Sequence, residues 1–163
     1  MSKPLLLASA SPRRRELLAQ LGVRFIVAPV DVDESPQPGE LPGALVSRLA
    51  CAKAQAALAA ADPEQWVLGA DTVVAVGREI LGKPGDDAAA AAMLRRLSGR
   101  VHTVHSGLFL ARRGLPGHGR AVRTRVWMRA IGDPEIAEYL ATGEPLGKAG
   151  AYAIQGRAAA FVR

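Results

Sequence analysis

The feature that most constrains the fold is an apolar stretch in the middle of the chain, residues 67–76, with the sequence Val-Leu-Gly-Ala-Asp-Thr-Val-Val-Ala-Val. A strand with one face in water alternates apolar and polar residues, whereas this stretch is apolar on both faces. It therefore predicts a central strand, and the fold has to be built around a sheet.

Asp71 is the acidic residue of this stretch. Burying its carboxylate costs free energy unless the group is paired, hydrogen-bonded or bound to a cation. Asp71 is therefore a candidate general base or metal ligand. The alternative is an aspartate that caps a turn at a strand end, since Gly69 could mark a bulge.

Strand and helix patterns alternate in the first half of the chain and mix with hairpins in the second. We predict strands at 4–8, 23–28, 66–76, 79–81, 101–111, 121–131 and 151–162, and helices at 12–21, 43–61, 86–97 and 133–142. This order indicates an α/β fold with a mixed sheet. The length of 163 residues fits one domain, or two lobes that share a core.

The chain is basic, with 21 lysines and arginines against 15 acids, a net charge of +6. Nine arginines and no acid lie between residues 95 and 129, whereas several acids cluster between residues 31 and 40. This segregation favours a polyanionic partner, either nucleic acid or a phosphorylated small molecule. Biased codon usage is the alternative origin of the arginines outside the motifs.

Cysteine content and hydropathy bear on the compartment. The single cysteine, Cys51, excludes an internal disulfide and fits a reducing environment. No stretch approaches the ~18 apolar residues that span a bilayer. We therefore expect a cytoplasmic protein without a membrane partner.

Residues 9–14, Ser-Ala-Ser-Pro-Arg-Arg, lie where the first strand meets the first helix. A helix N-terminus presents free backbone N–H groups to phosphate, and the guanidiniums of Arg13 and Arg14 add forked donors. Cations at this end oppose the helix dipole unless an anion is present. The motif therefore favours a phosphate site, with a solvated helix face paired to Glu16 as the alternative.

Two lysines are further candidates. Lys53 interrupts the apolar stripe of the helix at 43–61, so it either snorkels to the edge or meets an anion in a cleft. Lys83 stands between Gly82 and Pro84 directly after a strand, where it suits a polyphosphate but also an ordinary exposed turn.

Gln155 closes an apolar segment near the C-terminus, and we expect it at the end of a strand. A glutamine amide can both donate and accept hydrogen bonds at one base edge. The histidines predict no metal site, because His102 and His105 fall on opposite faces of a strand.

The order of the motifs is specific. From Leu5 to Gly156 the chain carries Leu-Ala-Ser-Ala-Ser-Pro-Arg-Arg, Glu34, Ala-Lys-Ala at 52–54, Gly-Ala-Asp-Thr-Val-Val at 69–74, Leu-Gly-Lys-Pro at 81–84 and Gly-Lys-Ala-Gly-Ala-Tyr-Ala-Ile-Gln-Gly at 147–156. This series resembles the Maf family over nearly the whole chain. The family usually has Gly where this chain has Ala10.

The resemblance implies a divalent-metal-dependent nucleotide pyrophosphatase with an elongated central sheet flanked by helices, related to inosine triphosphate pyrophosphatases. It implies one Maf-like domain over residues 1–163, with two lobes around a central cleft. Members usually continue with a segment containing a Gly-Ser-Tyr-Ser-like stretch, so that segment is expected to be missing after Arg163.

The resemblance also assigns roles to individual residues. The family's proton acceptor falls on Asp71, and its positions for base choice fall on Arg13, Thr72 and Gln155. The remaining polar cleft positions fall on Ser9, Arg14, Glu34, Lys53 and Lys83. We expect Asp71 and Glu34 to hold one divalent cation, Mg²⁺, Mn²⁺ or Co²⁺.

The ending with Gln155 is similar to the branch that hydrolyses dTTP and UTP to the monophosphate and pyrophosphate, a house-cleaning role in the nucleotide pool. The sister branch prefers 7-methyl-GTP and usually has an acidic residue at that position. Two further hypotheses are a basic nucleic-acid-binding protein and a Maf-like regulator of division without catalysis. We expect a nucleoside triphosphate substrate and no stable nucleic-acid partner, and a homodimer remains open.

Overall fold

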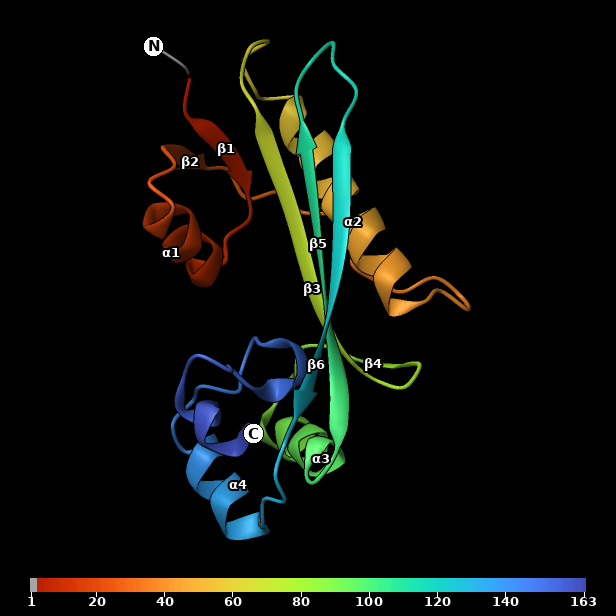
Figure 1. Cartoon of the computed structure of the whole chain (residues 1–163), viewed down its shortest axis with the longest axis vertical. Helices are drawn as coiled ribbons and strands as arrows, with labels where there is room; N and C mark the ends of the chain where they lie inside the picture. Colours follow the sequence, from red (N-terminus) through yellow and green to blue (C-terminus); the bar gives the residue numbers. More distant parts are fainter. Residues whose placement is uncertain (1–2) are drawn as a thin grey trace. The chain divides into compact units, whose positions relative to one another are not determined.

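The computed structural model describes residues 3–163 (Figure 1). Its helices and strands follow in the order β1 Leu5–Ala8, α1 Pro12–Gln20, β2 Phe25–Val27, α2 Pro42–Leu58, β3 Val67–Val76, β4 Glu79–Leu81, α3 Asp87–Leu97, β5 Val101–Ala111, β6 His118–Trp127 and α4 Asp133–Leu140. Two 3₁₀-helices follow, η1 Ala149–Ala151 and η2 Arg157–Phe161. Among the described residues, no helix combines the length and apolar character that a membrane crossing needs.

The strands form one mixed sheet of six strands in the order β2-β1-β3-β5-β6, with β4 paired to β3. β1 runs parallel to both of its neighbours, and Leu7 is opposite Val27 on one side and Leu68 on the other. β4 is antiparallel to β3. The predicted α/β class with a mixed sheet is confirmed, and the apolar stretch is a central strand, as its two-sided pattern predicts.

The chain divides into two compact units. The first unit comprises the residues up to Asp71 together with Ser106–Val122, and the second comprises Thr72–His105 together with Arg123–Arg163. The chain passes between the units within β3, β5 and β6, so neither unit is one continuous segment. The expectation of two lobes around a cleft stays a prediction.

In the first unit, α2 packs unusually close to the sheet. A Cβ added to Gly69 of β3 would lie 2.0 Å from the carbonyl oxygen of Ala50 in α2. A Cβ added to Gly107 of β5 would lie 2.2 Å from the carbonyl oxygen of Val46. Two glycines on neighbouring strands thus let the helix backbone touch the sheet (Figure 1). Gly69 marks this close approach and not the end of a strand.

The second unit has its own core around α3, α4 and the two 3₁₀-helices. The side chains buried in it include Leu94 and Leu97 of α3, Ile136 and Tyr139 of α4, and Phe161 of η2. The rings of Tyr139 and Phe161 meet edge to face, with centroids 5.3 Å apart. This packing fixes the C-terminal segment onto α4.

The predicted strand at 151–162 is wrong. Gly150 and Ala151 have φ angles of 69° and 60°, in the left-handed region, which a strand does not contain. Residues 154–156 form a turn, and Arg157–Phe161 is a 3₁₀-helix. Gln155 therefore lies in a turn and not at the end of a strand.

The other predicted elements occur, with shifted boundaries in places. The bounds of β4 and β5 are as predicted, whereas β2 is shorter than the predicted 23–28. β6 begins at His118 and ends at Trp127, so the expected strand at 121–131 starts earlier and stops sooner. Residues 112–117 therefore form the connection between β5 and β6.

Candidate active site

A buried ion pair joins the central strand to α2. Lys53 Nζ donates a hydrogen bond of 2.6 Å to Asp71 Oδ1 and another of 2.6 Å to Glu34 Oε1. Lys53 and Asp71 are each only 7% exposed. Both predicted groups are therefore paired inside the protein, and the alternative of a lysine that snorkels to the surface does not apply.

The close approach of α2 explains this pairing. Gly69 and Asp71 are two residues apart on β3, so their side-chain positions share one face of the strand. That face meets α2 where Ala50 touches Gly69, and Lys53 lies three residues further along the same helix. The missing side chain at position 69 thus brings the lysine within reach of the aspartate.

Glu34 comes from the acidic connection between β2 and α2. Arg48 of α2 holds this connection, because its Nε and one terminal nitrogen donate 2.8 Å hydrogen bonds to the two oxygens of Glu40. The same guanidinium donates a 3.0 Å bond to the carbonyl oxygen of Ser35, next to Glu34. The hydrogen bonds from Arg48, with a further one from the backbone N–H of Gln37, lower the pKa of Glu40 from its ordinary 4.5 to about 2.

Sequence reasoning missed Arg48. It stands outside every motif of the series, within a helix that shows an otherwise regular apolar stripe. The signal that could have found it is the presence of an acid, Glu40, eight residues earlier, with which its guanidinium can form an ion pair. Only the folded connection shows that the pair brings Glu34 to Lys53.

The N-terminal motif supplies a second cation to this place. Ser9 Oγ accepts a 2.8 Å hydrogen bond from Arg14 and a 3.3 Å bond from the backbone N–H of Ser11. Burial lowers the pKa of Arg14, and the charges of Asp71 and Glu34 act in the opposite direction. Arg14 therefore interacts electrostatically with Asp71 and Glu34, the two carboxylates that bind Lys53.

Arg13 pairs with a residue of its own helix and not with Ser9. Its guanidinium donates a 3.1 Å hydrogen bond to Glu16 of the same helix; the Arg13 side chain is partly exposed and that of Glu16 more so. This is the helix-face pairing that competes with phosphate binding in the sequence. Ser11 occupies the N-cap position of α1 but makes no side-chain capping bond.

The first unit thus gathers five of the predicted residues, Ser9, Arg14, Glu34, Lys53 and Asp71. One carboxylate oxygen of Asp71 and one of Glu34 converge on Lys53 Nζ. Carboxylate oxygens are also the ligands that a hard divalent cation binds. No group of three or more His, Cys, Asp or Glu side chains within residues 3–163 could hold a metal ion. The two carboxylates therefore fit Mg²⁺ bound together with substrate phosphates and water, as that ion prefers.

Three predicted residues belong to the second unit. Thr72 follows Asp71 on β3 and is half-buried. Lys83 is exposed after β4, where the preceding Gly82 accepts a 3.0 Å hydrogen bond from the backbone of Gly150. Gln155 is exposed in its turn.

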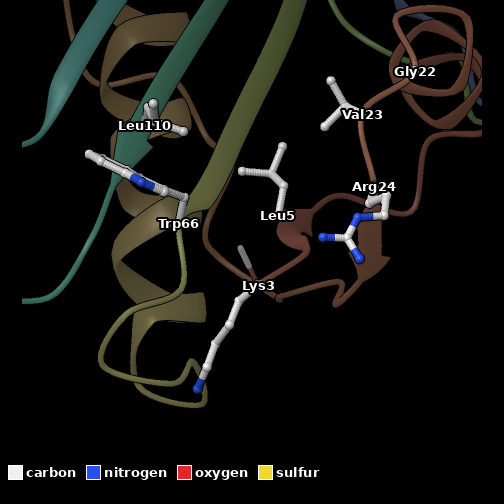
Figure 2. Close-up of a pocket in the computed structure, with 7 residues that line it drawn as sticks. All are labelled: Lys3, Leu5, Gly22, Val23, Arg24, Trp66 and Leu110. Carbon is white, nitrogen blue, oxygen red and sulfur yellow. The ribbon is translucent and has the colours of Figure 1, made fainter. Parts of the chain in front are cut away.

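An open depression of about 540 Å³ lies elsewhere in the first unit (Figure 2). Its lining comes from the start of β1, the segment before β2, the start of β3 and the end of β5, namely Lys3, Leu5, Gly22, Val23, Arg24, Trp66 and Leu110. It contains none of the predicted site residues, so it is not the candidate active site.

Comparison with known proteins bears on the meaning of this arrangement. The sequence model of the family described as Maf-like protein matches residues 4–163. The chain belongs to the Maf family. This membership confirms the resemblance that the ordered motifs predict.

Curated relatives within the Maf family are close in sequence. The dTTP/UTP pyrophosphatase of Myxococcus xanthus (strain DK1622) is 56% identical over 153 residues, covering 94% of this chain and 76% of that protein. The dTTP/UTP pyrophosphatase of Moorella thermoacetica (strain ATCC 39073 / JCM 9320) is 54% identical over 164 residues, covering 99% and 83%.

A solved structure has a similar fold. The Staphylococcus aureus Ham1 protein aligns with a TM-score of 0.56 over 98% of this chain and 91% of that chain, at 14% sequence identity. At this identity the likeness concerns the fold alone, and it supports the predicted α/β architecture of this Maf protein.

Proposed function

We propose that this Maf protein is a nucleoside triphosphate pyrophosphatase that hydrolyses dTTP and UTP to the monophosphate and pyrophosphate. The single observation that carries the proposal is the buried Lys53–Asp71 pair, with Glu34 and Arg14 beside it. Relatives about half identical over most of the chain are named for this activity.

The cationic side chains of the site are proposed to bind the triphosphate. Arg14 and Lys53 lie next to the acid of the site, and the resemblance adds Lys83 and Arg13 to the groups that contact phosphate or base. Hydrogen bonds from charged donors to phosphate oxygens are short and strong. Positioning and charge stabilisation supply most of the catalysis in such reactions.

Asp71 is the proposed base. In this role its carboxylate orients the attacking water and accepts the water's proton as the oxygen attacks the α-phosphate. Lys53 holds this carboxylate in place through its hydrogen bond to Oδ1, and Glu34 holds the Lys53 ammonium by accepting a second hydrogen bond from it. Ser9 in turn holds Arg14 through its hydroxyl oxygen.

Asp71 and Glu34 are the residues that would hold a divalent cation, Mg²⁺, Mn²⁺ or Co²⁺. When bound, such an ion offsets the negative charge of the phosphates and of the leaving pyrophosphate. The base would be read by Thr72 and Gln155 with Arg13. Polar groups matched to a pyrimidine edge reject a purine, because they would be left unpaired.

The test is a pyrophosphate-release assay over a nucleotide panel with each metal, using the wild type, Asp71→Asn and the exposed control Glu64→Gln. Asp71→Asn should lower kcat by about 10²–10⁴-fold, the usual contribution of a general base. Its affinity for a non-hydrolysable nucleotide, measured at saturating metal, should stay within about threefold, since the cations proposed to contact the phosphates are unchanged. Full turnover in Asp71→Asn would show that another group is the base.

The same panel separates the competing hypotheses. Release of pyrophosphate from 7-methyl-GTP in preference to UTP would favour the sister branch. A salt-sensitive gel shift without any pyrophosphate release would favour a nucleic-acid-binding protein. A house-cleaning role and a cytoplasmic setting are further parts of the proposal, and each needs a separate experiment.

A further inference from the structure

The turn that carries Gln155 is small and projects into solvent. It runs from Ala153 to Gly156 and is closed by one backbone hydrogen bond of 2.9 Å, from the N–H of Gly156 to the carbonyl oxygen of Ala153. Ile154 and Gln155 occupy its two central positions and are exposed. A turn with so few internal contacts needs outside support to hold a side chain in one place.

Glu144 supports the turn from its C-terminal side. Its Oε2 accepts a 3.1 Å hydrogen bond from the backbone N–H of Arg157, and its Oε1 accepts a 3.4 Å bond from that of Ala158. These are the first residues after the turn. The carboxylate therefore fixes the point at which the chain leaves the turn and enters η2.

Tyr139 supports the turn from its N-terminal side. Its hydroxyl oxygen accepts a 3.2 Å hydrogen bond from the backbone N–H of Ala153, and the same hydroxyl donates a 2.7 Å bond to Glu144 Oε1. The tyrosine is 3% exposed, and its ring is locked against Phe161. One tyrosine–glutamate pair on the α4 side therefore ties down both ends of the turn.

Gly156 fits this arrangement. Its φ of −104° is open to any residue, so the backbone conformation does not require glycine. A Cβ there would instead lie 2.3 Å from Glu144 Oε2. The missing side chain leaves room for the carboxylate.

The carboxylate of Glu144 is suited to remain charged in this role. Burial raises its pKa, but the hydrogen bonds from Tyr139, Arg157 and Ala158 and the charge of Lys148 outweigh burial, and the net change lowers the pKa. Lys148 Nζ also donates a 2.7 Å bond to the carbonyl oxygen of Glu144. An ionised carboxylate is an acceptor only, so it can accept the hydrogen bonds from Tyr139, Arg157 and Ala158 at the same time.

We propose that Glu144 and Tyr139 are positioning residues that hold the turn at 153–156, so that the amide of Gln155 meets the pyrimidine edge of the substrate. This inference rests on the proposed function, because it requires Gln155 to contact the base. A recognition group has to be held to within about 0.5 Å, and its supporting residues decide whether it is.

The experiment compares Tyr139→Phe, Glu144→Ala and Glu144→Gln with wild type and with Glu138→Gln, an exposed carboxylate on the same helix as Tyr139. Steady-state kinetics with UTP, dTTP and a purine triphosphate give kcat and KM, and hydrogen exchange reports the amides of residues 153–158. Tyr139→Phe and Glu144→Ala should raise KM for UTP and dTTP about tenfold and leave kcat within about threefold, as expected when recognition and not chemistry is impaired. Their preference for pyrimidine over purine should fall by a similar factor.

The amides of Ala153, Arg157 and Ala158 should exchange faster in both variants. Glu144→Gln, which keeps one acceptor oxygen, should lie between Glu144→Ala and wild type, and Glu138→Gln should match wild type. Faster exchange with unchanged base preference would overturn the inference, as would unchanged exchange. A wild-type protein that releases no pyrophosphate from any nucleotide would instead overturn the proposed function.

Discussion

Lys53 is the residue on which the geometry of the candidate site depends. Its ammonium group is buried between two carboxylates, those of Asp71 and Glu34. It lies on α2, the helix that packs closely against the sheet because Gly69 and Gly107 have no side chains. A buried charge is tolerated only when its partners are close and well oriented. Removing one member of such a group costs more stability than the intact group contributes.

Replacing Lys53 by Met should therefore destabilise the protein, because the buried carboxylate of Asp71 loses its cation. We expect the free energy of unfolding to fall by about 3–5 kcal/mol, the usual loss when one partner of a buried pair is removed. The control Lys3→Met breaks the exposed pair with Asp62 and should cost less than about 1 kcal/mol. Denaturant titration of both variants measures the difference.

Two further arms make this result specific. Adding Mg²⁺ or Mn²⁺ should recover part of the lost stability in Lys53→Met, since a cation can bind between the two carboxylates. The double variant Lys53→Met/Asp71→Asn should be more stable than Lys53→Met, because it carries no uncompensated carboxylate at position 71. An Lys53→Met protein as stable as wild type and indifferent to metal would contradict this account.

At the scale of elements, the contact between α2 and β3 sets the site. The helix reaches the strand because Gly69 has no side chain, and Gly107 plays the same part on β5. The atoms that a Cβ would meet there are backbone atoms of the helix, which cannot rotate away. The elements are therefore packed with no room for an added methyl group.

Gly69→Ala should push α2 away from the sheet. We expect a loss of about 1–3 kcal/mol, typical of overpacking, and a drop in activity because Lys53 moves from Asp71. Gly85→Ala is the matched control, since nothing lies within 4 Å of a Cβ added there. Thermal unfolding and pyrophosphate release would be measured together; equal stability of the two variants would refute the close contact.

The acidic connection before α2 is attached to the helix by the Arg48–Glu40 ion pair, so the stability of this attachment depends on pH. The pKa of Glu40 is lowered from 4.5 to about 2, chiefly by the hydrogen bonds from Arg48 and also by the one from the backbone N–H of Gln37. A lowered carboxyl pKa contributes stability that is present above the unfolded value of about 4.5 and is lost as pH falls through the folded value. The difference in unfolding free energy between wild type and Glu40→Gln should therefore be constant above about pH 4.5 and shrink toward pH 2.

Urea titrations between pH 2 and pH 7 measure that difference. Asp87→Asn, at the start of α3 in the second unit, serves as a control for general acid effects. A difference that stays the same down to pH 2 would mean that Arg48 does not hold Glu40 in solution.

At the scale of the whole molecule, each unit has its own buried core. Leu94 and Phe161 belong to the core of the second unit, whereas Leu6 and Val67 belong to a core of the first. Three strands nevertheless continue from one unit into the other. We expect this shared backbone to make unfolding a single cooperative event.

The two tryptophans test this expectation, because Trp66 lies in the first unit and Trp127 in the second. Leu94→Ala should lower the unfolding free energy by about 2–5 kcal/mol, as for other buried leucines. In Trp66→Phe and Trp127→Phe backgrounds, the remaining fluorescence should report the same shift of the urea midpoint. A shift of the urea midpoint that appears only in the Trp66→Phe background, where Trp127 is the remaining fluorophore, would show that the units unfold separately.

Much of this architecture is predictable from local pattern. The two-sided apolar character of residues 67–76 placed β3 at the centre of the sheet, and the helices predicted at 12–21 and 43–61 correspond to α1 and α2. These signals are local, since a strand or helix shows its period within its own residues. The C-terminal segment was wrongly predicted as a strand, because the backbone N–H groups at both ends of its turn bond to Glu144 and Tyr139, which lie outside the segment and enter no local pattern.

The sequence by itself determined the order of helices and strands as far as α4, the family and the identity of the candidate residues, because periodicity and motif order are properties of the chain alone. Tertiary structure decided which of them meet: Lys53 binds Asp71 and Glu34, while Arg13 turns to Glu16. The physical reason is that charges pair through space, and the close packing of α2 on Gly69 sets which charges come within reach.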